Sequence, residues 1–335
     1  MRAMQLDGAA NSFMQAGTFH TSPQWKFIMA SAAGTSPTAI RKATPMDMSL
    51  LVMLGAVWGS AFMAIRVGVQ ESGPVWLVAL RVSIGFLCLL PWALYRGWVW
   101  PANLREWGLI VLLSLLNVLI PFFLLSWAQQ TLHSSTTALL MGTGPLLAML
   151  IAHFTSDDDK FNASKAIAVV LGFSGVATVL GTAAFKGLSG GMLPPAAALL
   201  ASACYVTSGT LVRRAPSIPP VRLSTLVLGL GTAAFLPIAL LTQGTVPEMS
   251  AKAWTAIVFL GLVPTGIAYI LRYHLVRKIG LSMFAHVGNL IPLFGVTFGV
   301  ILLGEPLTIT LIIAAALIFA GLIVARVGAR KTGKP

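Results

Sequence analysis

The chain has 335 residues, of which 57% are hydrophobic and 9% are charged, and its formal net charge is +13. A soluble domain carries roughly 25% charged residues because its surface faces water, so this composition excludes a water-soluble globule. In lipid, backbone groups are satisfied within helices or a closed barrel, and the long apolar runs do not alternate as barrel strands do. We therefore expect an all-α integral membrane protein.

Residues 1–45 differ from the rest of the chain. They are mixed in character, rich in Ser, Thr and Ala, and show no strong period. They lack the charged start and the compact apolar stretch of a signal peptide. We expect either a disordered cytosolic tail or residues upstream of the true start at Met46 or Met48; an amphipathic surface helix is the alternative.

Ten apolar stretches follow, each close to the 20 or so residues that cross a bilayer core about 30 Å thick. Turn formers and charges separate them. The predicted spans are 49–67, 75–95, 107–126, 134–154, 164–182, 191–212, 223–242, 253–272, 281–303 and 307–326. They divide into a first repeat at 46–183 and a second at 190–327, and a basic tail follows at 328–335.

The orientation follows from the basic residues, because cytoplasmic loops carry an excess of Lys and Arg. With a cytoplasmic N-terminus, 18 of the 22 Lys and Arg residues fall on the inside, three fall on the outside, and Arg81 lies within a span. We therefore predict that both termini are cytoplasmic. The positive charge is then a topology signal, and no nucleic-acid partner is expected.

A shift of 147 positions superposes the two halves of the chain. This one ungapped offset aligns rare residues across four spans: Trp107 with Trp254, Pro145 with Pro292, Ser135 with Ser282, Arg66 with Arg213, Trp58 with Tyr205, and Ser60 with Thr207. Five helices per repeat is an odd number, so the second copy enters the membrane in the opposite orientation. Two inverted five-helix repeats can exchange conformations around a site near the midplane, which opens the site to each side in turn.

The chain resembles the EamA family of the drug/metabolite transporter superfamily. The likeness rests on Trp58 to Phe62, on Pro74 with Ala79-Leu80-Arg81, and on Gly304-Glu305-Pro306-Leu307, and it covers about 47–327. It departs from the family at Ala61, where Asn is frequent, and at Asp157-Asp158-Asp159, where the first repeat lacks a Gly-Glu turn. The resemblance implies a ten-helix inner-membrane exporter of amino acids, metabolites or drugs that does not hydrolyse ATP.

Helix breaks and a buried cation are the first candidates for a functional site. Pro145 and Pro292 sit within equivalent spans, and each proline removes a backbone donor, so we expect kinks that act in gating or serve packing alone. Ala148/Ala152 and Gly295/Gly299 follow them as small residues that let helices approach closely, which predicts a seam between the repeats. A charge such as Arg81 costs about 2.5–3.5 kcal/mol at a helix centre; it either contacts substrate or gates, or it pairs or snorkels to the interface.

His286 lies three residues before Asn289, on the same predicted helical face. It is either a neutral histidine in a helix seam or a substrate and proton-coupling group, and His286→Ala is expected to reduce transport without affecting insertion. An apolar pocket also needs a few orienting groups. The further substrate-cavity candidates are Trp58, Ser60, Asn117, Tyr205 and Tyr269.

Some classes of chemistry have little support. None of the nine acidic residues falls in the middle of a span, the chain lacks a GxxxxGK[ST] loop, and its two cysteines lie in apolar runs. We therefore expect no metal, no cofactor and no enzyme, but a transporter of a small molecule, as a monomer or homodimer in a lipid bilayer. Two alternatives stay open: a lipid transferase that uses Asp157-Asp158-Asp159 to bind magnesium diphosphate, and a passive pore or scaffold.

Overall fold

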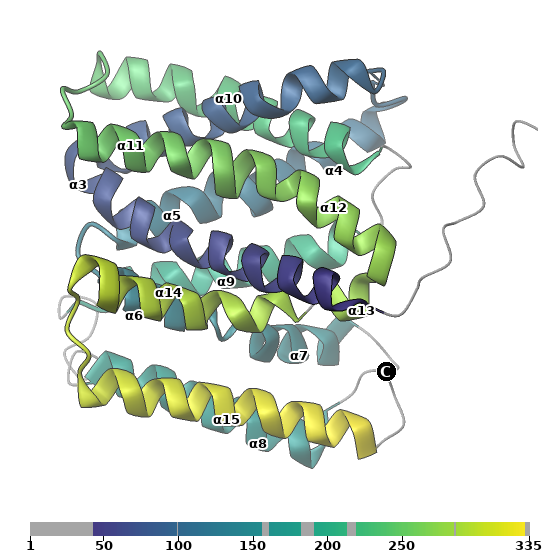
Figure 1. Cartoon of the computed structure of the whole chain (residues 1–335), viewed down its shortest axis with the longest axis vertical. Helices are drawn as coiled ribbons and strands as arrows, with labels where there is room; N and C mark the ends of the chain where they lie inside the picture. Colours follow the sequence, from purple (N-terminus) through teal and green to yellow (C-terminus); the bar gives the residue numbers. More distant parts are fainter. Residues whose placement is uncertain are drawn as a thin grey trace, which may run out of the picture. The chain divides into compact units, whose positions relative to one another are not determined.

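The described part of the chain is mainly helical. The computed structural model describes residues 43–98, 100–155, 161–181, 191–212, 219–284 and 286–331, and these ranges contain helices, turns and loops but no strand. The all-α prediction is confirmed for them. Most of the predicted tail, 1–45, and the acidic run 157–159 lie outside the described residues. The helices are α3 (Pro45–Tyr95), α4 (Leu104–Ser114), η1 (Leu115–Leu119), α5 (Ile120–Ala128), α6 (Ser134–Met141), α7 (Gly144–Thr155), α8 (Ala163–Leu180), α9 (Leu193–Val212), α10 (Pro220–Gln243), α11 (Ala251–Leu260), η4 (Gly261–Ile267), α12 (Ala268–Ile279), α13 (Leu281–Phe284), α14 (Val287–Leu303) and α15 (Ile309–Lys331) (Figure 1).

The first helix, α3, contains two predicted spans separated by a sharp bend. Its backbone leaves the helical region at Gly73, where φ is 67° and ψ is 168°. Glycine adopts this positive φ without the clash that a Cβ would cause, and the fixed φ of Pro74 suits the first position of the next segment. The predicted spans 49–67 and 75–95 therefore lie on either side of the bend.

Seven helical stretches within the described ranges are long and apolar enough to cross a membrane. The number is smaller than ten partly because α3, with its bend, counts once. The apolar α14 has only 17 residues, which is at the short end for a span. The count of ten therefore stays a prediction.

The duplication is visible in the local backbone. The π-helical segments η1 and η4 interrupt the third helix of each repeat at equivalent places. The N-caps of α4 and α11 also match, because Asn103 accepts from the N–H of Glu106 and Ser250 accepts from the N–H of Ala253. Asn103 and Ser250 are 147 positions apart, as are Asn117 and Pro264 at the centres of the two π-helical segments, so the offset found in the sequence also relates the bends and caps of the structure.

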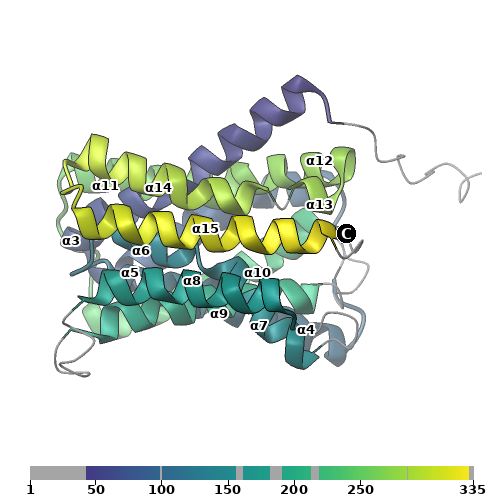
Figure 2. The ribbon, with the colours of Figure 1, turned by 90° about the horizontal axis from the view of Figure 1, so that it is seen from below.

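Equivalent helices of the two repeats pack against each other. Helix α15 contacts α8, and α10 contacts α3; Figures 1 and 2 both show α15 running alongside α8. Helix α14 of the second repeat lies against α6 of the first. Such pairing is the arrangement that an approximate two-fold axis between repeats produces.

Loops predicted to lie on the outer side of the membrane, opposite the cytoplasm, meet at one end of the bundle. Glu71 accepts hydrogen bonds from the N–H of Ser250 at 2.6 Å and from its hydroxyl at 2.7 Å. Arg66 donates to the carbonyl oxygens of Gln129 at 2.5 Å and Gln130 at 2.9 Å, directly after α5. The turns between α10 and α11 and between α14 and α15 lie at this end, on the left of Figure 1.

Segments predicted to be cytoplasmic meet at the opposite end. Lys278 Nζ is 2.8 Å from Asp47 Oδ1 at the start of α3, and Arg222 donates to the carbonyl oxygen of Arg96. Arg96 and Ser250 thus lie at opposite ends of the bundle. These described loops lie at the ends that the charge distribution predicts for them, while the assignment of one end to the cytoplasm stays a prediction.

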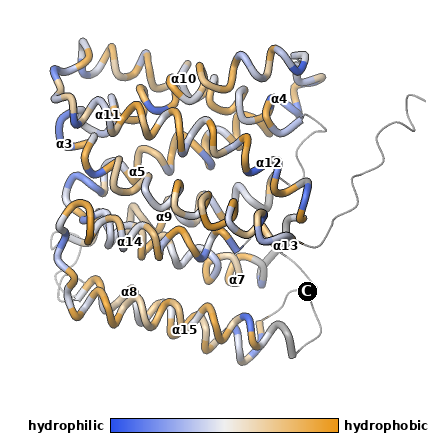
Figure 3. The backbone as a smooth tube through the Cα atoms, viewed as in Figure 1, coloured by the Kyte–Doolittle hydropathy of each residue, from blue (hydrophilic) through white to orange (hydrophobic). Residues whose placement is uncertain are grey.

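The outer surface of the bundle is apolar. Figure 3 shows hydrophobic residues along the helices and hydrophilic residues mainly near the helix ends. Large apolar side chains are strongly exposed, among them Leu241 at 86%, Ile301 at 71% and Val170 at 65%. Because lipid solvates such side chains and water does not, and because several helices can cross a membrane, the chain is a multi-pass membrane protein.

Candidate functional site

The π-helical segment η4 is built around Pro264. Proline has no backbone N–H, so the carbonyl of Leu260, four residues earlier, loses its ordinary helical donor. The hydroxyl of Thr265 donates to this carbonyl at 2.8 Å. Single π-helical turns are frequent at functional sites. The segment therefore places a buried hydroxyl and irregular backbone in the middle of a long apolar helix.

Arg81 lies opposite this hydroxyl. It is only 6% exposed, and eight residues of helix, roughly 12 Å, separate it from the bend at Gly73. Its Nε donates to Thr265 Oγ1 at 2.9 Å, and its guanidinium carbon lies 3.4 Å from the ring centroid of Phe122. Its Nη1 is buried and has no hydrogen-bond partner among the described residues. The side chain therefore points into the bundle and does not snorkel to the interface.

Three of the predicted polar and aromatic residues gather near Arg81. Tyr205 and Tyr269 pack against the apolar cluster that contains Phe122, and both lie within electrostatic range of the guanidinium. Asn117, in η1, places its Nδ2 3.5 Å from the Tyr269 hydroxyl, at the long limit of a hydrogen bond. The two π-helical segments therefore contribute polar groups to one region.

Trp58 approaches the same region from the first segment of α3. Its indole Nε1 donates to the carbonyl oxygen of Pro264 at 3.1 Å, and its ring packs edge-on against Phe284 at 6.1 Å. Arg272 lies 5.9 Å from the ring centroid of Tyr269. Ser60 is buried, but its hydroxyl donates to the carbonyl of Val57 in its own helix, so this hydrogen bond is local.

Helix breaks precede both Pro145 and Pro292, while a kink at each proline stays a prediction. The span 134–154 divides into α6 and α7 at Gly142-Thr143, and Pro145 occupies the first turn of α7, where a missing N–H costs little. In the second repeat α13 ends at Phe284, α14 begins at Val287, and Pro292 lies inside α14. Both breaks fall on the N-terminal side of their proline.

His286 and Asn289 lie at the start of α14. His286 is the N-cap residue and is exposed, and its Nδ1 is 3.1 Å from the carbonyl oxygen of Met283 within the same turn. Asn289 is half-buried. The structure therefore places both residues at the break between α13 and α14, while the hydrogen bonds around Arg81 involve other residues.

Two glycines form a close seam between the repeats. A Cβ on Gly295 would lie 2.4 Å from the Cβ of Ala138 in α6, and a Cβ on Gly299 would lie 2.5 Å from a carboxylate oxygen of Glu305. Neither distance leaves room for a side chain. The small residues of α14 thus allow the close contact with α6 that their spacing predicts.

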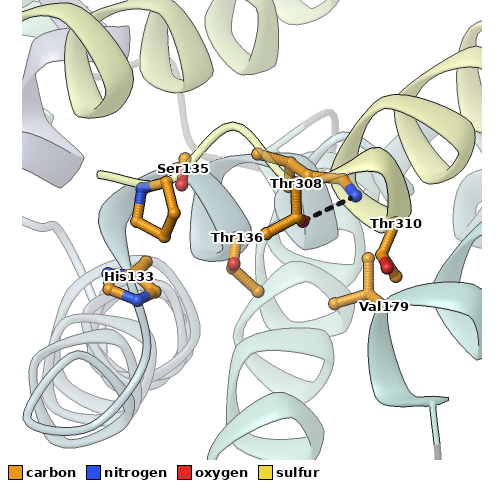
Figure 4. A pocket seen from close by; sticks show the side chains of 8 residues that line it. His133, Ser135, Thr136, Val179, Thr308 and Thr310 are labelled. Atoms are coloured by element: carbon orange, nitrogen blue, oxygen red, sulfur yellow. Dashed lines mark hydrogen bonds between the residues drawn. The ribbon is translucent and has the colours of Figure 1, made fainter. Parts of the chain in front are cut away.

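A polar pocket of about 180 Å³ lies at the end of the bundle predicted to face outside. His133, Ser135 and Thr136 line it from the start of α6, Thr308 and Thr310 from the start of α15, and Val179 from α8 (Figure 4). The hydroxyl of Thr308 accepts from the N–H of Leu311. The pocket is separate from the region around Arg81.

Glu305 stands beside this pocket and holds the start of α6. Its carboxylate accepts from the backbone N–H groups of Ser134 at 2.7 Å and Ser135 at 2.8 Å, and His133 Nδ1 is 3.8 Å away. Burial alone would raise the pKa of Glu305, but the hydrogen bonds from Ser135 and Ser134 outweigh it and hold the pKa below its usual value. The carboxylate also compensates the positive end of the helix.

Sequence reasoning missed the partners of these groups. Thr265 and Phe122 were not among the candidates, because a single Thr or Phe in an apolar span gives no distinct signal. Pro264 was the available signal for η4, since a proline within a span marks a disturbed backbone. Glu305 was noticed only within a turn motif.

The geometry around Arg81 suits binding. A cation, hydroxyl groups, an amide and aromatic faces converge between elements of both repeats, and pockets for small ligands are mostly apolar with a few such orienting groups. These side chains come from helices that the two repeats contribute separately, so relative movement of the repeats would change the distances among them.

Comparison with known proteins finds similarity to transporters. A sequence profile of the EamA-like transporter family matches residues 46–181 and again residues 193–327. The uncharacterized transporter YoaV of Bacillus subtilis is 24% identical over 279 residues, which cover 81% of this chain and 95% of that protein. A probable terminal-alkyne amino-acid exporter of Streptantibioticus cattleyicolor is 24% identical over 274 residues, which cover 81% and 90%.

A solved structure shares the fold. A protein of known crystal structure superposes with a TM-score of 0.61 at 19% sequence identity, and the match covers 86% of this chain and 99% of that chain. At this level of identity the likeness concerns the arrangement of helices and not the ligand.

Proposed function

The chain belongs to the EamA-like transporter family, and from this premise we propose that it is a secondary transporter that exports small metabolites, amino acids or drugs by alternating access. The proposal includes ten membrane spans in two inverted repeats, at 46–183 and 190–327. It also includes a place in the inner (plasma) membrane with both termini in the cytoplasm, flanked by the tails 1–45 and 328–335. The transporter needs no cofactor.

The observation that carries the proposal is the cross-repeat contact at the π-helical segments. Arg81 of the first repeat donates to Thr265 of the second, and Trp58 of the first donates to Pro264 of the second. Irregular backbone at membrane depth is tolerated where it is buried in protein or lines a cavity. A site made from such backbone between inverted repeats is the arrangement that alternating access requires.

A relative supports the choice among substrates. The Streptantibioticus cattleyicolor protein is described as a probable exporter of a terminal-alkyne amino acid, which favours small organic metabolites for this chain. The breaks before Pro145 and Pro292 supply points where α6–α7 and α13–α14 could bend as the site opens to each side. In this proposal Trp58, Asn117, Tyr205 and Tyr269 line the cavity around Arg81, and Ser60, His286 and Asn289 face it in one of the two states.

Labelling from each side of the membrane tests the mechanism. In a background without Cys88 and Cys204, Asn117→Cys is treated with a membrane-impermeant thiol reagent from either side. Alternating access predicts modification of Asn117→Cys from both sides. The matched controls Arg105→Cys and Lys252→Cys should each react from one side only, and from opposite sides.

Two results would contradict the proposal. Modification of Arg105→Cys and Lys252→Cys from the same side would exclude inverted repeats. Modification of Asn117→Cys from both sides, combined with flux that rises linearly with concentration and never saturates, would indicate a passive pore.

A further inference from the structure

The buried charge of Arg81 is only partly satisfied. Its Nε donates to Thr265 Oγ1 and its planar face lies on Phe122, while Nη1 is buried without a hydrogen-bond partner among the described residues. A hydroxyl oxygen and an aromatic ring offer partial negative charge, but neither neutralises a cation. A buried cation is costly unless it is paired.

The acidic side chains that the structure describes are engaged at helix ends or exposed in a loop. Four of these carboxylates are engaged at helix ends: Asp47 with Lys278, Glu71 with Ser250, Glu106 with the N–H of Ala102, and Glu305 with Ser134 and Ser135. Glu248 is exposed in the loop before α11. The other four are Asp7 and Asp157–Asp159, which lie outside the described ranges and outside the predicted spans. Among the described residues, therefore, Arg81 has no carboxylate partner.

We propose that the exported molecule supplies the missing charge, through an anionic group that binds the unpartnered Nη1 of the Arg81 guanidinium. A guanidinium pairs well with a carboxylate or a phosphate because its N–H groups match their oxygens. The Asn117 amide and the Tyr269 hydroxyl lie in the same region and supply further donors. This inference rests on the proposed export function and narrows its substrate to organic acids, including amino acids.

The same charge disfavours another group of substrates. Arg81 is buried and has no carboxylate partner among the described residues, and Arg272 lies 5.9 Å from the ring centroid of Tyr269, so the region carries positive charge. A purely cationic drug would bring like charge into a poorly solvated site, where repulsion is strong. An acid with an apolar body instead places its charge on Arg81 and its body against Phe122 and Tyr205.

The cell's own metabolite pool serves as an unbiased probe. A bacterial host produces the wild-type chain, Arg81→Met, Arg105→Met or no transporter, and mass spectrometry measures the compounds that accumulate in the medium. Compounds that rise with the wild type should carry a carboxylate or a phosphate, and sorting them by group distinguishes the two. Losing one charge-assisted hydrogen bond costs about 1.5–3 kcal/mol, so Arg81→Met should reduce their export about tenfold or more.

Matched variants separate charge from folding. Arg105 is exposed near the start of α4, so Arg105→Met removes the same charge and should leave export unchanged. Arg81→Lys retains the charge but loses the geometry of the Nε bond to Thr265, so it should export the same acids more slowly. Size-exclusion chromatography checks that each variant is folded, and the wild-type export profile is informative even if Arg81→Met does not fold.

The outcomes are distinguishable. If the exported compounds lack an anionic group, or if folded Arg81→Met exports the same acids at the wild-type rate, the anion site is wrong and the transporter proposal stands. If the wild type enriches the medium in no compound beyond the transporter-free control, the export function fails and the anion site fails with it.

Discussion

The two repeats share a backbone but differ in chemistry at the same place. In each repeat a π-helical segment interrupts the third helix, η1 in the first and η4 in the second. Thr265 in η4 accepts a hydrogen bond from Arg81 of the first repeat. At the positions 147 residues away, Leu228 and Val118 lie buried in one apolar cluster.

This difference separates the backbone features that both repeats share from the polar contacts that a ligand would use. The bends and caps occur in both repeats, which suits the proposed exchange of conformations between the two halves. A molecule that crosses the centre of the bundle needs only one set of polar contacts, and a second buried arginine would add cost without a partner. Duplication therefore explains the backbone, and divergence explains the site.

The strongest way to break this comparison is to place the charge in the wrong repeat. Leu228→Arg puts a guanidinium beside Val118, which offers no hydrogen bond, and we expect destabilisation by about 3 kcal/mol. Thermal unfolding of the purified protein in detergent measures the loss. Leu228→Met is the matched control, because it keeps the length without the charge and should cost less than about 1.5 kcal/mol.

A double variant sharpens the test. Adding Val118→Thr to Leu228→Arg reproduces the hydroxyl acceptor of the second repeat and should recover about 1 kcal/mol. If Leu228→Arg alone is as stable as the wild type, the two positions do not differ in their environment as the structure describes.

The seam offers a second comparison, between Gly295 and its counterpart Ala148. A Cβ at Gly295 would lie 2.4 Å from Ala138, so Gly295→Ala should destabilise the protein by about 2 kcal/mol through overpacking. Ala148→Gly should cost only about 0.5–1 kcal/mol, through backbone entropy. Gly288→Ala is the control, because nothing lies within 4 Å of its Cβ position. Equal melting temperatures for Gly295→Ala and Gly288→Ala would contradict the close contact.

A third prediction concerns Glu305, which ties the second repeat to α6 of the first. Because its pKa is held below the usual 4.5, its stabilising contribution is complete above about pH 4.5 and is lost as the pH falls through the lower folded-state value. Glu305→Gln should therefore lower the melting temperature at pH 7, by the equivalent of about 1 kcal/mol, and flatten the acid side of the pH profile.

The controls isolate the carboxylate. A His133→Gln background removes the nearby imidazole, 3.8 Å from Glu305 Oε1, so a difference in pH dependence between Glu305→Gln and its parent in this background belongs to the Glu305 carboxylate. Glu106→Gln removes a carboxylate that bonds the N–H of Ala102 at an exposed site and should change little. Identical acid unfolding of Glu305→Gln and the wild type would show that the hydrogen bonds between Glu305 and the start of α6 do not stabilise the protein.

The helices were predictable from the sequence because lipid imposes a simple rule. Apolar runs of sufficient length mark the membrane-spanning helices, and the 147-residue offset revealed the repeat. The bend at Gly73 falls within the segment Glu71 to Pro74, whose turn-forming residues separate the first two predicted spans. The π-helical turn η1 had no such marker, because Asn117 occupies the place where the second repeat has Pro264.

The contacts of the site were less predictable because they join distant parts of the chain. The sequence drew attention to Arg81, but its partner Thr265 is 184 positions away and is aligned with an ordinary Val118. Glu305 meets Ser134 across 171 positions. Helical periodicity indicates which residues share a face, but it does not indicate which other helix that face meets.

The smallest expected effect comes from giving the second repeat, at position 265, the residue that the first repeat has at position 118. Thr265→Val copies Val118, keeps the β-branched shape, and removes both the acceptor for Arg81 Nε and the donor to the carbonyl of Leu260. We expect a folded protein whose export falls about fivefold, which corresponds to roughly 1 kcal/mol, because Arg81 loses its positioning contact. Thr242→Val removes a hydroxyl that bonds only its own exposed helix turn and should leave export unchanged. Thr265→Ser should restore much of the rate, since it returns the hydroxyl without the methyl group. Wild-type export by Thr265→Val would mean that Arg81 is positioned by Phe122 alone, and the polar difference between the repeats would then lie in a single residue.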